Sequence, residues 1–170
     1  QHLQKLQKNV EHRLNTIHSA FSLPLDEIHL MTLPPRHCHR LFERYKHEEE
    51  MDFLMKQLIN LNQNRLYIIG SNQMGTMISL PSLLKKKTLS YQSVFLIDEE
   101  GADLIDGGDY LCVTYRGNYE QSAYWGQQLA QYAHAHKFKI RGDLLEILWI
   151  DIHTTSDESE YITQLQLPIA

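Results

Sequence analysis

The chain has 170 residues, of which 42% are hydrophobic and 22% are charged. These values describe an ordinary globular domain and exclude a disordered, collagen-like or membrane-spanning chain. The formal net charge is −5, and the lysines 85–87 form the only basic run. The chain therefore lacks the basic stripe of a nucleic-acid-binding surface.

The first predicted element is a helix over residues 3–21, followed by Pro24, which ends it. Its apolar residues recur at steps of three and four, which is the spacing of one helical stripe: Leu3, Leu6, Val10, Leu14, Ile17 and Phe21. A narrow stripe on a polar helix suits a coiled-coil seam or docking onto a domain. Because the chain begins with Gln1, inside this periodic segment, we expect further residues upstream.

Two stretches of similar organisation follow, with boundaries expected at about 26–101 and 102–170. In the first, we predict strands at 28–33, 66–69, 76–80 and 93–97, and a helix over 42–62. In the second, we predict strands at 110–115, 144–152 and 161–169, and a helix over 119–136. The pattern predicts an α+β fold of two strand-helix-strand-strand repeats with antiparallel sheets and pseudo-two-fold symmetry, preceded by the helical segment 1–22.

Glu146 has the most unusual predicted position, because both faces of its strand are apolar. Alternation places Leu144, Leu148 and Ile150 on its own face, and Leu145, Ile147 and Trp149 on the opposite face. Burying an unpaired carboxylate costs on the order of several kcal/mol, so this group must be protonated, paired or bound to a cation. Two interpretations remain open: an ion pair with an arginine such as Arg36 or Arg141 (or a place at a sheet edge), and a ligand site.

Other candidate motifs give weaker evidence for a functional site. His37-Cys38-His39 places two histidines on one side of an extended segment, but no second ligand pair with zinc spacing follows. Cys38 and Cys112 show no repeated spacing, which excludes a disulfide framework and fits a reducing cytoplasm. Gly107-Gly108 lacks the Gly-Lys-Ser/Thr of a phosphate loop, and no Gly-x-Ser-x-Gly occurs. We predict no metal, no cofactor and no membrane association.

Three segments of the second half follow one another in a recognisable order: Gly108-Asp109-Tyr110, Tyr115-Arg116-Gly117-Asn118-Tyr119 and Leu144-Leu145-Glu146-Ile147-Leu148-Trp149-Ile150. In this respect the chain resembles the GyrI-like effector-binding domains at the C-terminus of MerR-family multidrug-sensing transcription regulators. The first half matches in its order of elements and in Leu33-Pro34. The resemblance implies that helix 3–21 is a dimerisation helix leading from a winged helix-turn-helix DNA reader that these residues do not contain.

The resemblance also implies a site. In that family a glutamate at the place of Glu146 meets cationic, aromatic drugs, and Tyr115 and Tyr161 match aromatic pocket positions. Leu148 would form part of the floor, and Tyr67 from the first half the opposite wall. The expected ligand is a hydrophobic, cationic or aromatic small-molecule effector bound between the repeats of a cytoplasmic homodimer, without catalysis. For each tyrosine the alternative is an ordinary core or rim aromatic.

Two other functions remain open. Some GyrI-like proteins hydrolyse DNA-alkylating compounds, and Glu146 and Tyr115 would then orient water and protonate the leaving group. A protein-binding module would instead expose an acidic surface such as residues 48–50. The helix over 3–21 favours the sensing domain, since a separate hydrolase has no need of it.

Overall fold

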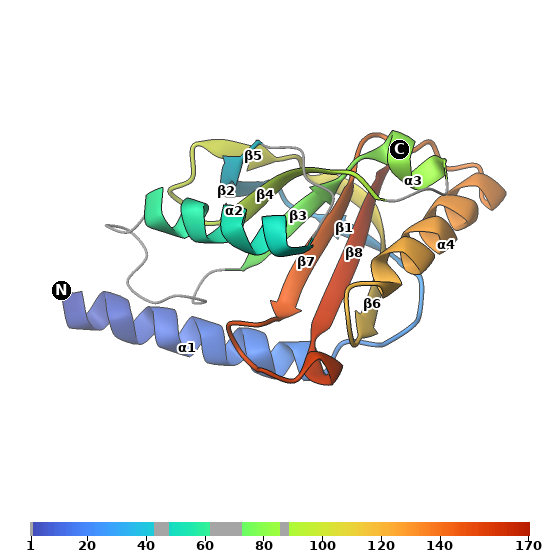
Figure 1. The fold of residues 1–170 in the computed structure, drawn as a ribbon. Helices are drawn as coiled ribbons and strands as arrows, with labels where there is room; N and C mark the ends of the chain where they lie inside the picture. The colour runs from blue at the N-terminus through green and yellow to red at the C-terminus, as the bar shows by residue number, and fades with distance from the viewer. Residues whose placement is uncertain (1, 43–47, 62–72, 86–88) are drawn as a thin grey trace.

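A computed structural model of the chain describes residues 2–42, 48–61, 73–85 and 89–170 (Figure 1). The elements of the first part are α1 (His2–Phe21), β1 (His29–Leu33), β2 (Arg36–Leu41), α2 (Glu48–Leu61), β3 (Met74–Ile78), α3 (Leu80–Leu84), β4 (Tyr91–Ile97) and β5 (Asp103–Ile105). Those of the second are β6 (Gly108–Arg116), α4 (Gln121–Ala135), β7 (Leu144–Ile150), the short 3-10 helix η1 (Glu158–Glu160) and β8 (Ile162–Ile169). None of the helices in these ranges has the length and apolar character needed to span a membrane.

The strands form one eight-stranded antiparallel sheet in the order β1-β6-β8-β7-β3-β4-β2-β5. The two halves meet at the pair β7–β3, and outward from this pair they read β7, β8, β6 and β3, β4, β2. The outermost strands are exchanged: β1 leads into the first half but pairs with β6, whereas β5 leads into the second half but pairs with β2. The register of these outer pairs repeats as well. The last residue of β1, Leu33, pairs with the first residue of β6, Gly108, and the last residue of β5, Ile105, pairs with the first residue of β2, Arg36. The predicted α+β fold with two related halves is confirmed, in a single sheet.

The strand β2 corrects the predicted first repeat. We expected Pro34-Pro35 to end the extended segment, but the chain turns there and returns as β2, which is the counterpart of β6. Its mixed charged and polar residues gave no apolar run, and its pairing with β4 and β5 supplies the hydrogen bonds. The elements α3 and β5 were also not predicted. The predicted helix 42–62 is described as α2 from Glu48 to Leu61, and residue 42 is not helical. The predicted strand 66–69 lies outside the described residues.

The two faces of the sheet carry separate cores. Helices α3 and α4 cover one end of the first face, with Leu83 and Leu129 packed against Leu144, and α2 covers its other end. The opposite face encloses a third cluster, to which Cys38, Phe95 and Ile147 belong. The predicted alternation along β7 is therefore confirmed: its even-numbered residues Leu144 to Leu148 face the helices and Leu145 and Ile147 face away.

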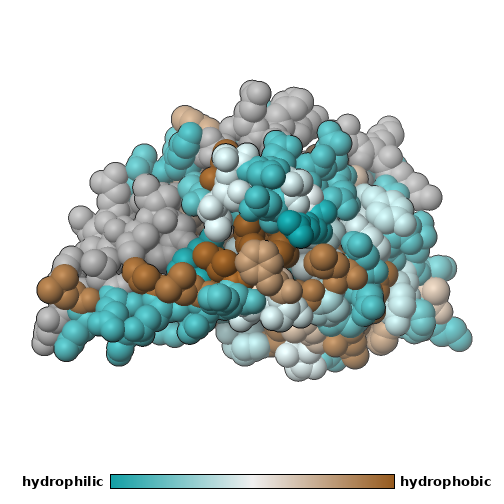
Figure 2. Space-filling view, turned by 90° about the horizontal axis from the view of Figure 1, so that it is seen from below, coloured by the Kyte–Doolittle hydropathy of each residue, from teal (hydrophilic) through white to brown (hydrophobic). Residues whose placement is uncertain are grey.

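Helix α1 docks onto the domain through its last turns. Ile17 and Ala20 pack against Ile150 of β7 and Ile162 of β8. Four other residues of the predicted stripe are exposed, with the following exposed fractions: Leu3 77%, Val10 41%, Leu14 52% and Phe21 65%. Figure 2 shows apolar side chains following one another along this helix. The stripe thus divides into a docked end and a surface that no residue of the described chain covers.

Candidate functional site

Glu146 lies at the centre of the sheet, where the two halves meet. Its strand neighbours are Thr76 on β3 and Leu165 on β8, and the residue is 1% exposed. On the helix-covered face it stands between two apolar clusters, since Leu144 belongs to the one under α4 and Leu148 to the one under α2. The fold therefore places a carboxylate at the junction of both halves and both cores.

Hydroxyl groups surround this carboxylate. Thr76 Oγ1 donates to Glu146 Oε1 at 2.8 Å, and Ser122 Oγ at the start of α4 donates to Oε2. The Tyr115 hydroxyl lies 2.7 Å from Ser122 Oγ. Since the serine proton is directed to the carboxylate, Tyr115 is the donor in this pair. The result is a buried series of hydrogen bonds from Tyr115 through Ser122 to Glu146.

The two arginines considered as partners of Glu146 lie elsewhere. Arg36 is on the opposite face of the sheet, where its Nη1 donates to Gln166 Oε1 at 2.8 Å. Arg141 donates through Nε to the Ile169 carbonyl oxygen at 2.6 Å. Strand β7 is moreover central, so the alternative of an edge position is also wrong. The proposed structural ion pairs with Arg36 and Arg141 are therefore excluded.

Three tyrosines gather near the carboxylate. Tyr119 and Tyr161 are stacked with ring centroids 5.3 Å apart, and Tyr115 and Tyr161 are buried. Burial is the main cause that raises the pKa of the Tyr119 hydroxyl, and the nearby carboxylates Asp151 and Glu146 raise it further. Tyr119 therefore stays neutral, and its aromatic face lies within electrostatic reach of Glu146.

Leu148 contributes the apolar part of the site. It belongs to a cluster with Leu54, Met55 and Leu58 of α2 and with Met74 of β3, and Tyr119 packs against this cluster. Methionine side chains adapt their shape readily and fill irregular spaces between apolar groups. Leu148 thus lies on the same face of β7 as Glu146 and packs against α2; its role as the floor of a ligand site stays a prediction.

The structure brings together four of the five residues singled out from the sequence, namely Glu146, Tyr115, Tyr161 and Leu148. Tyr67 lies outside the described residues. Sequence reasoning missed Thr76, Ser122 and Tyr119 as site residues. The apolar periodicity of the helix predicted over 119–136 places Ser122 on its inner face, and Tyr119 belongs to the motif Tyr115-Arg116-Gly117-Asn118-Tyr119, so the sequence contained a signal for both. The sequence contained no signal for Thr76, because its place beside Glu146 results from the pairing of β3 with β7.

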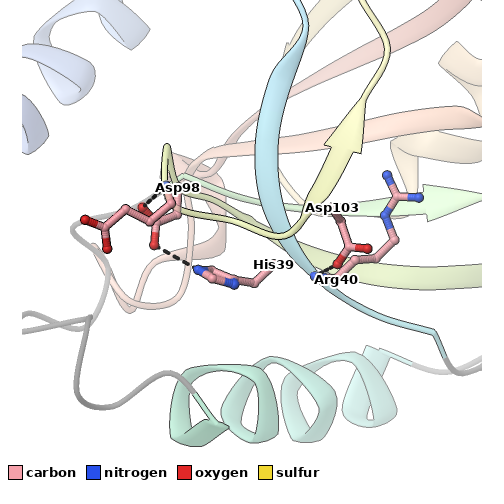
Figure 3. A network of polar contacts seen from close by, with 5 residues as sticks. His39, Arg40, Asp98 and Asp103 are labelled. Atoms are coloured by element: carbon pink, nitrogen blue, oxygen red, sulfur yellow. Dashed lines mark hydrogen bonds and ion pairs between the residues drawn. The ribbon is translucent and has the colours of Figure 1, made fainter.

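The side chains of His37-Cys38-His39 do not converge on one point. Among the described residues, no group of three histidine, cysteine or acidic side chains is arranged to hold a metal ion. His39 Nε2 lies 2.9 Å from Asp98 Oδ2 (Figure 3), whereas Cys38 points to the opposite, enclosed face. Cys38 and Cys112 are both buried, free thiols. Burial raises the pKa of Cys112 to about 12, so this thiol is protonated at neutral pH.

Solved structures share this fold. The C-terminal domain of EcmrR superposes with a TM-score of 0.65 at 14% identity, over 85% of this chain and 97% of that one. EcmrR in its complex with DNA superposes with the same score and identity over 99% of this chain and 68% of that one. A hydrolase from Listeria innocua gives a TM-score of 0.51 at 10% identity, over 89% and 96%. No protein-family model and no curated protein sequence matches the chain.

These likenesses establish the class to which the fold belongs. The C-terminal domain of EcmrR has the same fold as this chain. The predicted GyrI-like fold is confirmed at this level. Sequence identities of 10–14% carry the comparison no further than the fold.

Replacing Ser122 by alanine tests the hydroxyl chain. The variant leaves the Tyr115 hydroxyl and one carboxylate oxygen without the bridging group, so we expect the free energy of unfolding to fall by about 1–3 kcal/mol. Urea denaturation measures the change. Ser156→Ala, at an exposed position, is the matched control and is expected to stay within about 0.5 kcal/mol of the parent chain. Equal stability of the two variants would show that the hydrogen bonds joining Tyr115, Ser122 and Glu146 contribute nothing to the stability of the fold.

Proposed function

We propose that the chain is a non-catalytic sensing domain of a transcription regulator, and that it binds hydrophobic, cationic aromatic compounds at Glu146. The observation that carries the proposal is a buried carboxylate at the junction of the two halves, surrounded by hydroxyl groups, tyrosine rings and an apolar cluster. A lipophilic cation needs all three: counter-charge, aromatic faces and apolar area.

Access to Glu146 requires movement, because the residue is 1% exposed. The groups above it belong to two separate elements: Ser122 to α4, and Leu54, Met55 and Leu58 to α2. A ligand that binds only an opened arrangement shifts the population toward it. Binding is thus expected to change how α2 and α4 cover the sheet.

Strand β7 connects the site to α1. It carries Glu146 near its middle and Ile150 at its end, and Ile150 packs against Ala20. Arg13 of α1 also donates to Thr154 Oγ1, in the loop after β7, at 2.7 Å. A displacement of β7 would therefore reach the helix that, in the proposed regulator, leads to a DNA-binding part. The DNA complex of EcmrR supports this role, because its likeness extends over 99% of the chain.

A binding titration tests the sensing function. Ethidium, an aromatic cation, is expected to raise the melting temperature of the chain in a saturable way, because a ligand that binds the folded state stabilises it. N-phenyl-1-naphthylamine, a neutral aromatic dye, is expected to raise it less. Equal effects of the two dyes would contradict a counter-charge in the site, and no effect of either would contradict a ligand site.

The hydrolase alternative remains a prediction. Ser122 links Tyr115 to Glu146, and all three side chains are buried, so the tyrosine proton already has an acceptor. Incubation with an electrophilic cyclopropane compound separates the two functions. A sensing domain leaves the compound unchanged, whereas a hydrolase yields the ring-opened, hydrated product.

The exposed stripe of α1 fits a second copy of the chain, as in the predicted homodimer. Its residues are spaced as in a coiled-coil seam, and no described residue covers them. We expect Leu14→Glu to abolish concentration-dependent association, because it places a charge on this seam. Sedimentation measures the association, and Asn15→Glu, on the polar side, is the control. A chain that is monomeric at every concentration, or a Leu14→Glu variant that still dimerises, would contradict this role.

A further inference from the structure

The enclosed face of the sheet, opposite Glu146, holds a chain of buried polar side chains. Arg36 donates to Gln166 Oε1 at 2.8 Å, Gln166 Nε2 donates to Gln164 Oε1 at 2.7 Å, and Gln164 Nε2 donates to Thr114 Oγ1 at 3.2 Å. In each of these three hydrogen bonds the donor is the group nearer to Arg36 in the series. The series is therefore polarised, with its positive end at the guanidinium of Arg36.

The guanidinium groups at this end have buried nitrogens without an acceptor. Nε and Nη2 of Arg36, and Nε of Arg40, are buried and have no hydrogen-bond partner among the described residues. Both arginines extend from β2 to the enclosed face, as Cys38 between them does. A buried N–H without a partner costs about 1–3 kcal/mol, and more when the group is charged. Such donors call for an acceptor that the described residues do not supply.

A cavity lies at the same end of the sheet. Its volume is about 150 Å³, and its lining includes Arg40 from β2, Arg141 from the segment before β7, and Tyr110 from β6. The guanidinium carbons of Arg36 and Arg141 each lie 5.7 Å from the centroid of the Tyr110 ring. Two arginines, Arg40 and Arg141, thus line this cavity. Arg36, from the same strand as Arg40, lies beside the ring of Tyr110, which is also part of the lining.

The acidic groups nearby do not neutralise these arginines. Asp103 accepts from the backbone N–H of Arg40 at 3.0 Å, and no ion pair joins it to the Arg40 guanidinium (Figure 3). Asp143 accepts from the backbone N–H of Leu80 at 2.9 Å. Asp106, which also lines the cavity, is exposed, so solvent screens its charge. The buried charge that lacks a partner is positive.

We propose that this end of the enclosed face binds a small oxyanion, held by the guanidinium groups of Arg36, Arg40 and Arg141. The chemistry is that of arginine with carboxylate or phosphate, in which planar N–H donors meet two oxygens at once. The site is separate from Glu146, because it lies on the other face of the sheet. The oxyanion proposal does not depend on the proposed sensing function, and a separate experiment tests each of the two.

Nuclear magnetic resonance of the arginine side chains tests the proposal. In the ¹⁵N-labelled chain, the Nε–Hε signals of Arg36 and Arg40 are expected to shift in a saturable way with inorganic phosphate or with acetate. The two titrations decide which oxyanion the site prefers. Sodium chloride at matched ionic strength is the control for simple screening. Shifts that are the same with all three salts, or that do not saturate, would overturn the site and indicate that water satisfies these donors.

Two arginine variants test where the anion binds. Arg36→Met is expected to weaken binding of the preferred anion by about tenfold or more, since it removes hydrogen bonds to a charged group. Arg116→Met, at an exposed arginine of β6 that contacts Ser159, is expected to leave the affinity unchanged. If Arg36→Met fails to fold, the titration of the parent chain still decides. Equal losses in both variants would show non-specific attraction and overturn the proposal.

Discussion

Ethidium binding is expected to weaken by about 30-fold or more when Glu146 is replaced by glutamine. Removing one partner of a buried charge pair costs about 2–5 kcal/mol, and about 1.4 kcal/mol corresponds to a factor of ten in affinity. Glutamine keeps the size of the side chain, and its one carbonyl oxygen still accepts a hydroxyl proton. The change therefore removes the charge with little change of shape, and a fluorescence titration measures it.

Two controls accompany this variant. The neutral N-phenyl-1-naphthylamine should bind Glu146→Gln at least as well as the parent chain, because burying a neutral amide there costs less than burying a carboxylate. Glu120→Gln, at an exposed position just before α4, should leave the affinity for ethidium unchanged. Unaltered ethidium binding by Glu146→Gln would remove Glu146 from the site.

Gly75→Ala is expected to lower the stability of the fold. A Cβ atom at Gly75 would lie 2.4 Å from Cζ of Phe95 and 2.7 Å from the backbone oxygen of Glu146. The ring and the β3–β7 pair would both have to move, and overpacking of this kind costs about 1–3 kcal/mol. The melting temperature should fall by several degrees, because about 1 kcal/mol corresponds to about 2–4 °C in a domain of this size.

Gly142→Ala provides the matched control for this variant. Its Cβ would meet Cγ of Pro168 at 3.7 Å, which is an ordinary van der Waals contact. The same change of residue should therefore be neutral or slightly stabilising at position 142, through the loss of freedom in the unfolded chain. Similar melting temperatures for the two alanine variants would mean that the joint between the halves tolerates an additional methyl group.

The part of the site that lies on one strand was predictable from the sequence. Alternation alone gave the face of Glu146 and its apolar neighbours, because side chains of a strand point to opposite sides in turn. The face of α4 that carries Ser122 followed in the same way from helical periodicity. Local patterns of this kind do not depend on the pairing of distant segments.

The rest of the site and of the sheet order depends on contacts between segments that are distant in the sequence. Thr76 meets Glu146 across the β3–β7 pair, and no local pattern states which strand lies beside which. The strand β2 has charged residues at Arg36 and Arg40, so it lacked the apolar alternation by which strands are recognised. Its position in the sheet, and the oxyanion site proposed there, became visible only with the pairing of β2 to β4 and β5.

Intermolecular nuclear Overhauser effects between bound ethidium and the protein test the central claim most directly. The proposed site predicts contacts from the ligand to the rings of Tyr119 and Tyr161 and to the methyl groups of Leu148, and none to the groove between α3 and α4. Contacts confined to that groove, about 580 Å³ in volume and lined by Leu84 and Phe138 among others, would contradict a site at Glu146.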